Sequence, residues 1–131
     1  MKQSVVGIVF LDNKFLLGLR KNEGKIGGFW EFPGGKCEGN ETHTQALQRE
    51  YLEELEIAIE VGKFIGKNTF DNGRYLFELF AYEVFLPENA KLECNEHQRF
   101  SWFSFSDLQT LHLVPSDKLF LSQLREFYNL K

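Results

Sequence analysis

The chain has 131 residues, the usual size of one domain, and 43% of them are hydrophobic, so it can bury a core without disulfides or structural metals. No apolar run approaches the ~20 residues of a membrane span. The net charge of −4 argues against binding a nucleic-acid polymer, which requires a basic surface. The start of the chain does not resemble a signal peptide, and two cysteines are too few for a disulfide framework. We therefore expect one domain over residues 1–131, cytoplasmic, with reduced thiols and no membrane partner.

The N-terminal segment is expected to be rich in β-structure. Residues 5–10 and 15–19 have strand composition, and Asp12-Asn13 between them predicts a hairpin. A stretch rich in glycine and aromatic residues follows, over residues 24–35. Its aromatic run covers residues 29–32, and Pro33-Gly34-Gly35 is predicted to stop that run.

A helix is predicted over residues 42–55. Thr42, with Gln45 three residues later, has the form of a capping box at a helix N-terminus. Apolar residues then recur every four positions and form one stripe for burial, at Leu47, Tyr51 and Leu55.

After the helix, strand composition returns on both sides of a turn sequence, Asp71-Asn72-Gly73. The elements expected from there to the end are strands over 57–70, 75–86 and 99–103 and helices over 106–111 and 116–128. Strands mixed with helices in this order predict an α+β fold.

The predicted central helix has three carboxylates at positions i, i+3 and i+4, which are Glu50, Glu53 and Glu54. We expect them to share one face of the helix, opposite the apolar stripe. Like charges at this spacing repel, and a hard cation such as Mg²⁺ would offset the repulsion. The alternative is an ordinary solvated face. The preceding Gly34-Gly35 pair favours a metal or phosphate, because it allows close approach of the backbone.

At this point the chain resembles the Nudix family, whose signature is G-x5-E-x7-R-E-U-x-E-E-x-G-U, with U a bulky aliphatic residue. Gly35, Glu41 and Arg49 have the two long spacings of this signature, and the sequence from residue 49 to 57 supplies its R-E-x-x-E-E core. Two positions differ, since Tyr51 replaces the aliphatic residue and Glu56 replaces the glycine after the helix. A residue other than glycine at a left-handed helix end would be strained, unless the helix ends differently.

The resemblance implies a Nudix α/β/α sandwich with a mixed central sheet. It implies one or more Mg²⁺ ions, with Mn²⁺ as a substitute, bound by the Gly35 carbonyl and by the carboxylates Glu50, Glu53, Glu54 and Glu96. Glu53 or Glu50 would serve in catalysis, Arg49 would orient the acids, and Glu41 would tie the loop to the helix.

Further residues are implied by the MutT-like members of the family. Glu96 would be a fourth carboxylate, as metal ligand or general base, although an acidic surface turn is the alternative. Its neighbour His97 is expected to be structural or solvated. Lys36 and Arg20 would contact phosphates, and the alternative for Arg20 is a solvated strand end.

The base of a nucleotide would meet Asp117, Phe77 and Phe80. An ionised aspartate only accepts hydrogen bonds, so it suits an exocyclic amino group such as that of cytosine or guanine. The alternatives are that Asp117 caps the last helix and that both phenylalanines belong to the core.

The resemblance implies hydrolysis of a (deoxy)nucleoside triphosphate to a monophosphate and pyrophosphate, with clearance of oxidised nucleotides such as 8-oxo-dGTP as one role. Another Nudix activity, on dinucleoside polyphosphates or nucleotide sugars, is the alternative, and Tyr75 faintly favours the former. A non-catalytic nucleotide sensor is a third possibility, which the complete set of carboxylates argues against. The nucleotide is the one expected partner, and the protein would be a monomer or a homodimer.

Overall fold

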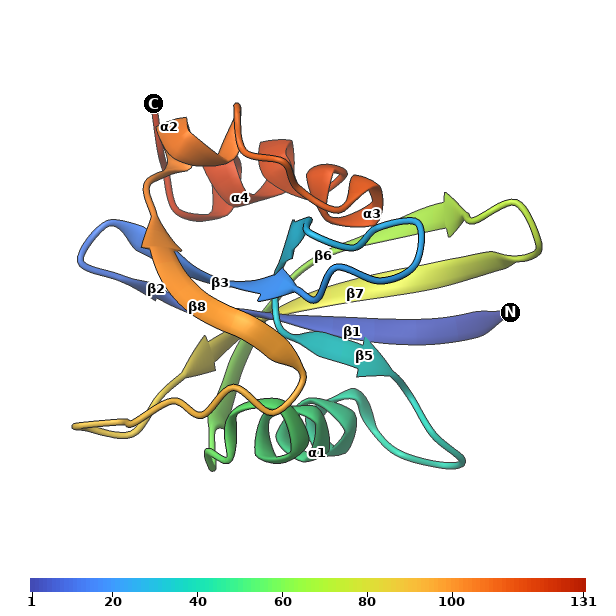
Figure 1. Cartoon of the computed structure of the whole chain (residues 1–131), viewed down its shortest axis with the longest axis horizontal. Helices are drawn as coiled ribbons and strands as arrows, with labels where there is room; N and C mark the ends of the chain where they lie inside the picture. Colours follow the sequence, from blue (N-terminus) through green and yellow to red (C-terminus); the bar gives the residue numbers. More distant parts are fainter.

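The computed structural model describes residues 1–131 and places two β-sheets between layers of helix (Figure 1). The first sheet has the strand order β5-β1-β7-β6. Strand β1 pairs in parallel with β7, whereas β1 with β5 and β6 with β7 are antiparallel, so the sheet is mixed as expected. Its strands are β1 (Lys2–Ile8), β5 (Gly34–Lys36), β6 (Glu60–Asp71) and β7 (Leu76–Phe85).

The second sheet is antiparallel and is centred on β3 (Lys14–Arg20). Strand β8 (His97–Phe103) pairs along one edge of β3, while β2 (Phe10–Leu11) and β4 (Trp30–Glu31) pair with successive parts of the other edge. The predicted hairpin turn lies between β2 and β3. The sequence did not predict that the strands would separate into two sheets.

One helix, α1 (His43–Leu55), covers one side of the sheets, and three short helices cover the other (Figure 1). This arrangement confirms the α+β sandwich. The predicted helix over 116–128 is wrong as one element, because an i to i+3 hydrogen bond from Phe120 N to the Asp117 carbonyl makes a tight turn that buries Phe120 completely. The three helices are α2 (Phe105–Leu108), α3 (Pro115–Lys118) and α4 (Leu121–Phe127). None of the helices is long and apolar enough to cross a membrane.

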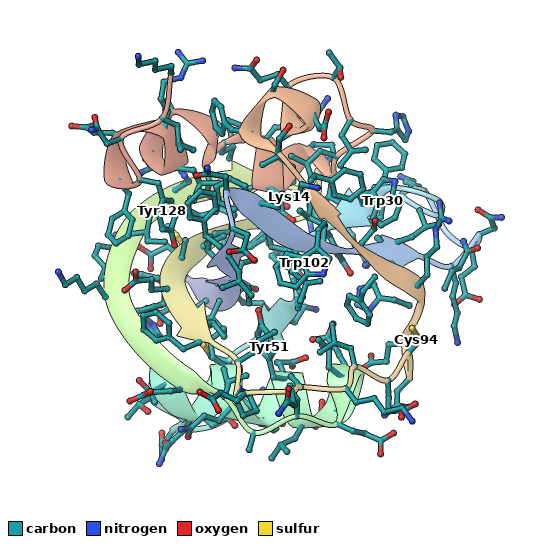
Figure 2. The ribbon with its side chains drawn as sticks, turned by 90° about the vertical axis from the view of Figure 1, so that its left-hand side faces the viewer. Lys14, Trp30, Tyr51, Cys94, Trp102 and Tyr128 are labelled. Carbon is teal, nitrogen blue, oxygen red and sulfur yellow. The ribbon has the colours of Figure 1, made fainter.

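Helix α1 begins with the predicted capping box. The Thr42 hydroxyl accepts a hydrogen bond from Gln45 N at 3.1 Å, and the Gln45 side chain accepts one from Thr42 N at 2.9 Å. Tyr51 points from α1 towards the sheets (Figure 2), where its hydroxyl donates to the Gly7 carbonyl at 3.1 Å. A side chain at Gly7 would collide with the Tyr51 ring, so the glycine makes room for the larger residue. Tyr51 therefore fits where the family signature has an aliphatic residue.

The helix ends at Glu56, which adopts the left-handed conformation with φ 55° and ψ 44°. Its N–H donates to the Leu52 carbonyl at 3.1 Å, and Ile57 N donates to the Tyr51 carbonyl at 3.4 Å. This is the termination that glycine normally serves. Glu56 therefore keeps the family geometry and bears the conformational strain itself.

Candidate active site

The segment before β8 is fastened to the last turn of α1. Glu93 N donates to the Leu55 carbonyl at 3.1 Å, and Asn95 N donates to the Glu54 carbonyl at 3.2 Å. The Asn95 side chain adds a third bond, to the Glu53 carbonyl at 2.9 Å. Helix-end carbonyls have no partner within the helix, so this segment satisfies them from outside. The next residue along the chain, Glu96, is thereby placed beside the helix acids.

Three carboxylates meet at this junction, from Glu50, Glu54 and Glu96. One oxygen from each lies within 4.8 Å of the others. They open into a cavity of about 490 Å³, called the acidic cavity below, whose lining contains no hydrophobic residue. The lining residues are Arg20, Lys21, Glu23, Glu31, Gly34, Gly35, Glu50, Glu54, Asn95, Glu96 and His97.

Gly35 allows this close packing. A Cβ atom there would lie 2.6 Å from the Glu50 carboxyl carbon, so no other residue fits without moving the acid. The sequence rule that the glycine pair permits close approach applies here, and the group that approaches in this structure is the Glu50 carboxylate.

Glu54 is a buried acid with little to neutralise it. Glu54 is 4% exposed. Its burial and, to a smaller extent, the charge of the nearby Glu50 raise its pKa to about 10. Its Oε2 atom has no hydrogen-bond partner. Burial also raises the pKa of Glu50, although the bond from Arg49 opposes that shift. Burial therefore keeps Glu54 protonated at neutral pH unless a cation lies beside it.

These observations fit a divalent cation. Clustered carboxylate oxygens are the ligands that hard cations prefer, and a buried oxygen without a partner is the feature a ligand bond would resolve. A cation would also reverse the raised pKa values by favouring the ionised acids. The acidic cluster can therefore hold a metal ion.

Arg49 does not line the acidic cavity, but its guanidinium connects the glycine loop to acids of the helix. Its guanidinium donates two bonds to Glu41, at 2.7 and 2.9 Å, and one to Glu50 at 2.7 Å. It also donates to the Lys36 carbonyl at 2.9 Å, which holds the glycine loop. Glu41 in turn accepts from Glu38 N at 2.8 Å, and the bonds from Arg49 lower its pKa. Loop, helix and acids are thus joined through one side chain.

The helix acids do not face as the sequence indicated. At about 100° per residue, Glu54 projects near the direction of Leu47, so it belongs to the buried face and not to the one opposite. Glu53 has a side chain that is 51% exposed, lies 3.3 Å from Arg49, and is outside the group of three carboxylates. The structure therefore brings Glu50, Glu54 and Glu96 together and leaves Glu53 at the rim.

Two residues of the cavity were missed as site residues, Glu31 and His97. Glu31 accepts from Arg20 at 3.0 and 3.2 Å, and its other neighbour is His97 Nε2 at 2.8 Å. Arg20 lines the acidic cavity as a half-exposed cation. His97 is buried, so the solvated alternative is wrong. In the sequence, the position of His97 directly after Glu96 is the only sign that it lies near the acidic cavity.

Lys36 does not line the acidic cavity. Successive residues of a strand point to opposite faces, so Gly35 faces Glu50 while Lys36 faces away. There the Lys36 amine neighbours the Tyr75 hydroxyl and lowers the pKa of that phenol. The separate cavity that they line, of about 150 Å³, also includes Lys2, Ser4, Asn72 and Phe77.

A second cavity of about 150 Å³ adjoins the acidic one and shares Glu31, Gly34 and Gly35 with it. We call it the apolar cleft, because seven of its thirteen lining residues are hydrophobic. Its remaining lining residues are Ser4, Val5, Val6, Ile26, Phe32, Phe77, Leu79, Val114, Ser116 and Asp117. The structure does not bring Phe80 here. Phe80 lies on the other face of β7, where its ring packs on His43 of α1 with centroids 4.3 Å apart.

Asp117 is a buried residue of the apolar cleft and does not cap a helix. Its Oδ2 accepts from Phe32 N at 2.9 Å, and the residue is 3% exposed. Burial and, to a smaller extent, the charge of Glu31 raise the pKa of Asp117 to about 8. At neutral pH the carboxyl is therefore mostly protonated and can donate a hydrogen bond as well as accept one, unlike the ionised aspartate assumed from the sequence.

A model of the NUDIX domain family matches residues 1–124 of this chain. The chain belongs to the Nudix family. It is 35% identical over 118 residues to the CTP pyrophosphohydrolase of Escherichia coli K12, covering 89% of this chain and 86% of that protein. The 8-oxo-dGTP diphosphatase of Proteus vulgaris is 51% identical over 47 residues, or 36% of this chain and 42% of that one. The solution structure of the E. coli ORF135 protein superposes with a TM-score of 0.85 at 32% identity, covering 98% of this chain and 91% of that one.

These matches make the chain a MutT-like Nudix hydrolase. The family signature maps onto the loop and helix that hold the acidic cavity, from Gly35 to Ile57. The departures at Tyr51 and Glu56 leave that geometry unchanged.

Proposed function

We propose that this Nudix hydrolase cleaves a (deoxy)nucleoside triphosphate to the monophosphate and pyrophosphate, with Mg²⁺ as its cofactor. The observation that carries the proposal is the junction of the two cavities. Three clustered carboxylates line one, and an apolar cleft with a single buried polar group, Asp117, opens beside it. A phosphate chain and a base need these two environments side by side.

The residues of the acidic cavity would have different roles in phosphoryl transfer. Glu54 and Glu96 would hold Mg²⁺ next to Glu50, and the ion would supply charge neutralisation to the phosphates and make water more acidic. Arg20 would contact a phosphate oxygen from the opposite wall, since it lines the same cavity. Positioning and charge neutralisation are what this reaction mainly requires.

We assign the proton-accepting role to Glu50. Its Oε1 is fixed by Arg49 at 2.7 Å, which leaves Oε2 for the cavity. Arg49 thus fixes the orientation from which Oε2 would accept a proton from water. Arg49 serves as a positioning residue, and Glu53 at the rim has a smaller part.

The base would enter the apolar cleft against Phe77 and reach Asp117 at its end. A neutral carboxyl can donate to a ring nitrogen or carbonyl of the base and accept from an amino group. Cytosine and guanine derivatives each present both types of group. The names of the relatives, which include a CTP pyrophosphohydrolase and an 8-oxo-dGTP diphosphatase, support the same two classes.

Pyrophosphate release over a panel of nucleotides tests this function. The panel contains CTP, dCTP, dGTP and 8-oxo-dGTP, each measured with Mg²⁺ and with a chelator. We expect release from at least one member, only with Mg²⁺, and loss of that release in Glu50→Gln. Turnover of none of them, or equal turnover in the chelator, would refute the proposal.

A second candidate substrate class is the dinucleoside polyphosphates. The cavity lined by Lys2, Lys36 and Tyr75 adjoins the apolar cleft through Ser4 and Phe77, so an aromatic ring and two cations lie beyond the expected base. Lys2 Nζ lies 4.6 Å from the Tyr75 ring centroid. Adding a diadenosine polyphosphate to the panel distinguishes the two, and its preference over every triphosphate would favour this class.

A further inference from the structure

The imidazole of His97 is held rigidly inside the protein, next to the acidic cavity. Its side chain is 2% exposed. The ring packs against Phe100 with centroids 5.0 Å apart, and a Cβ at Gly18 would lie 2.7 Å from its Cδ2. Such packing leaves the ring no freedom to turn. The direction of each ring nitrogen is therefore fixed by the fold.

One ring nitrogen is committed to Glu31. Nε2 lies 2.8 Å from Glu31 Oε2, and the same carboxylate accepts bonds from Arg20 at 3.0 and 3.2 Å. An ionised carboxylate can only accept, so Nε2 must carry a proton. In the neutral ring, this choice leaves a lone pair on Nδ1.

That lone pair faces Glu54 and has no partner. Nδ1 lies 3.8 Å from Glu54 Oε1, which is too long for a hydrogen bond. Nδ1 of His97 and Oε2 of Glu54 are both buried without a hydrogen-bond partner. Two neighbouring side chains that each bury a polar atom without a partner are costly unless another group supplies the missing bonds.

We propose that His97 Nδ1 is a direct nitrogen ligand of a metal ion that it shares with Glu54, with Glu31 as the carboxylate that orients the ring. A metal with ligand bonds of about 2.1 Å to nitrogen and oxygen spans a separation of ~3 to 4 Å between the two atoms. A ligating histidine nearly always donates its other N–H to a carboxylate, which is the arrangement of Glu31 and Nε2. The inference rests on the proposed metal dependence and adds the identity of a ligand.

A nitrogen ligand changes which ions the site selects. Mg²⁺ prefers oxygen ligands, whereas imidazole suits first-row transition metals such as Fe²⁺, Ni²⁺ and Zn²⁺. Glu54 thus lies between two possible metal positions. One, towards Glu50 and Glu96, offers only oxygen ligands, and the other, towards His97, offers nitrogen and oxygen ligands. The protein should therefore bind Co²⁺ or Zn²⁺ more tightly than Mg²⁺.

Pulsed electron paramagnetic resonance of the full chain with Mn²⁺ alone tests the ligand directly, because a coordinated imidazole modulates the echo through its ¹⁴N nucleus. The chain has only three histidines, so each can be replaced in turn. We expect ¹⁴N modulation in the unmodified protein and in the controls His43→Gln and His112→Gln, and its loss in His97→Gln. Bound Mn²⁺ without ¹⁴N modulation, or modulation that persists in His97→Gln, would overturn the inference and leave the proposed function standing. Failure of Mn²⁺ to bind at all would overturn both.

A second variant keeps the test independent of the folding of His97→Gln. Glu31→Gln retains the imidazole and removes the carboxylate that fixes its tautomer. We expect its affinity for Co²⁺, measured by calorimetric titration, to fall by about 10 to 100-fold, while its affinity for Mg²⁺ changes by less than about threefold. Equal losses for both ions would contradict a nitrogen ligand.

Discussion

The acidic cavity and the apolar cleft share three residues, yet they are built in different ways. Four of the eleven residues of the acidic cavity come from the glycine loop and α1, where Arg49 holds the adjacent Glu50, and three come from residues 95–97. The cleft gathers β1, β7 and α3, which are far apart in sequence. The glycine loop and α1, which are near in sequence, therefore form the centre of the charged region, while long-range packing creates the apolar one. Substitutions in the acidic cavity should therefore lower the rate of hydrolysis. Substitutions in the apolar cleft should change the substrate preference.

The largest effect is expected from the acids. Glu54→Gln and Glu50→Gln should each lower kcat by on the order of 10² or more, because each removes a carboxyl group that would act on the metal ion or the attacking water. Glu53→Gln should cost less, since Glu53 is at the rim. Steady-state kinetics with Mg²⁺ would measure all three. An equal or larger loss in Glu53→Gln would contradict the geometry described for the cluster.

The Glu54→Gln variant also provides a control for folding. Glu54 is forced to keep a proton inside the apo protein, since its pKa is about 10, and a glutamine requires no proton there. The free energy of unfolding of Glu54→Gln in chelator at pH 7 should therefore rise. A fall would mean that lost activity reflects a damaged fold.

Asp117 should make stability depend on pH. Its pKa is raised from 3.8 to about 8 on folding, so between these values the folded state binds a proton that the unfolded state has released. Stability from this group is complete below about pH 4 and falls as pH rises to about 8, by at most ~1.4 kcal/mol per pH unit. Subtracting the profile of Asp117→Asn from that of the unmodified protein isolates this contribution. A flat difference would show that Asp117 is not protonated.

The two phenylalanines of β7 separate binding from packing. Phe77→Ala should raise KM for the preferred nucleotide about tenfold, with kcat nearly unchanged, because it removes a wall of the apolar cleft. Phe80→Ala should leave KM unchanged and lower stability, because that ring packs on His43. The reverse pattern in the two variants would place the base on the other face of the sheet.

The smallest effect concerns the strained helix end. Glu56→Gly should raise the free energy of unfolding by about 1 kcal/mol, because glycine adopts the left-handed conformation without steric cost. Glu56→Ala keeps a Cβ and should give no such gain. Denaturant melts of the two variants would measure the difference, and equal stability would show that Glu56 is unstrained.

The sequence predicted the parts of this molecule that depend on neighbours along the chain. The capping box at Thr42 follows from spacing and residue type, and the family resemblance placed Gly35 near the helix acids. It could not predict the burial of Glu54 or the separation of Phe77 from Phe80, which depend on how α1 and β7 dock on their neighbours. The raised pKa of Asp117 was likewise hidden, because distant elements bury it.

The three bonds by which residues 93 to 95 engage the end of α1 have a kinetic consequence. Fraying of that last turn would release Asn95 and withdraw Glu96 from the carboxylate cluster, while His97 stays in place through the pairing of β8 with β3. The amide of Asn95 would then exchange with solvent at the rate at which the catalytic centre opens.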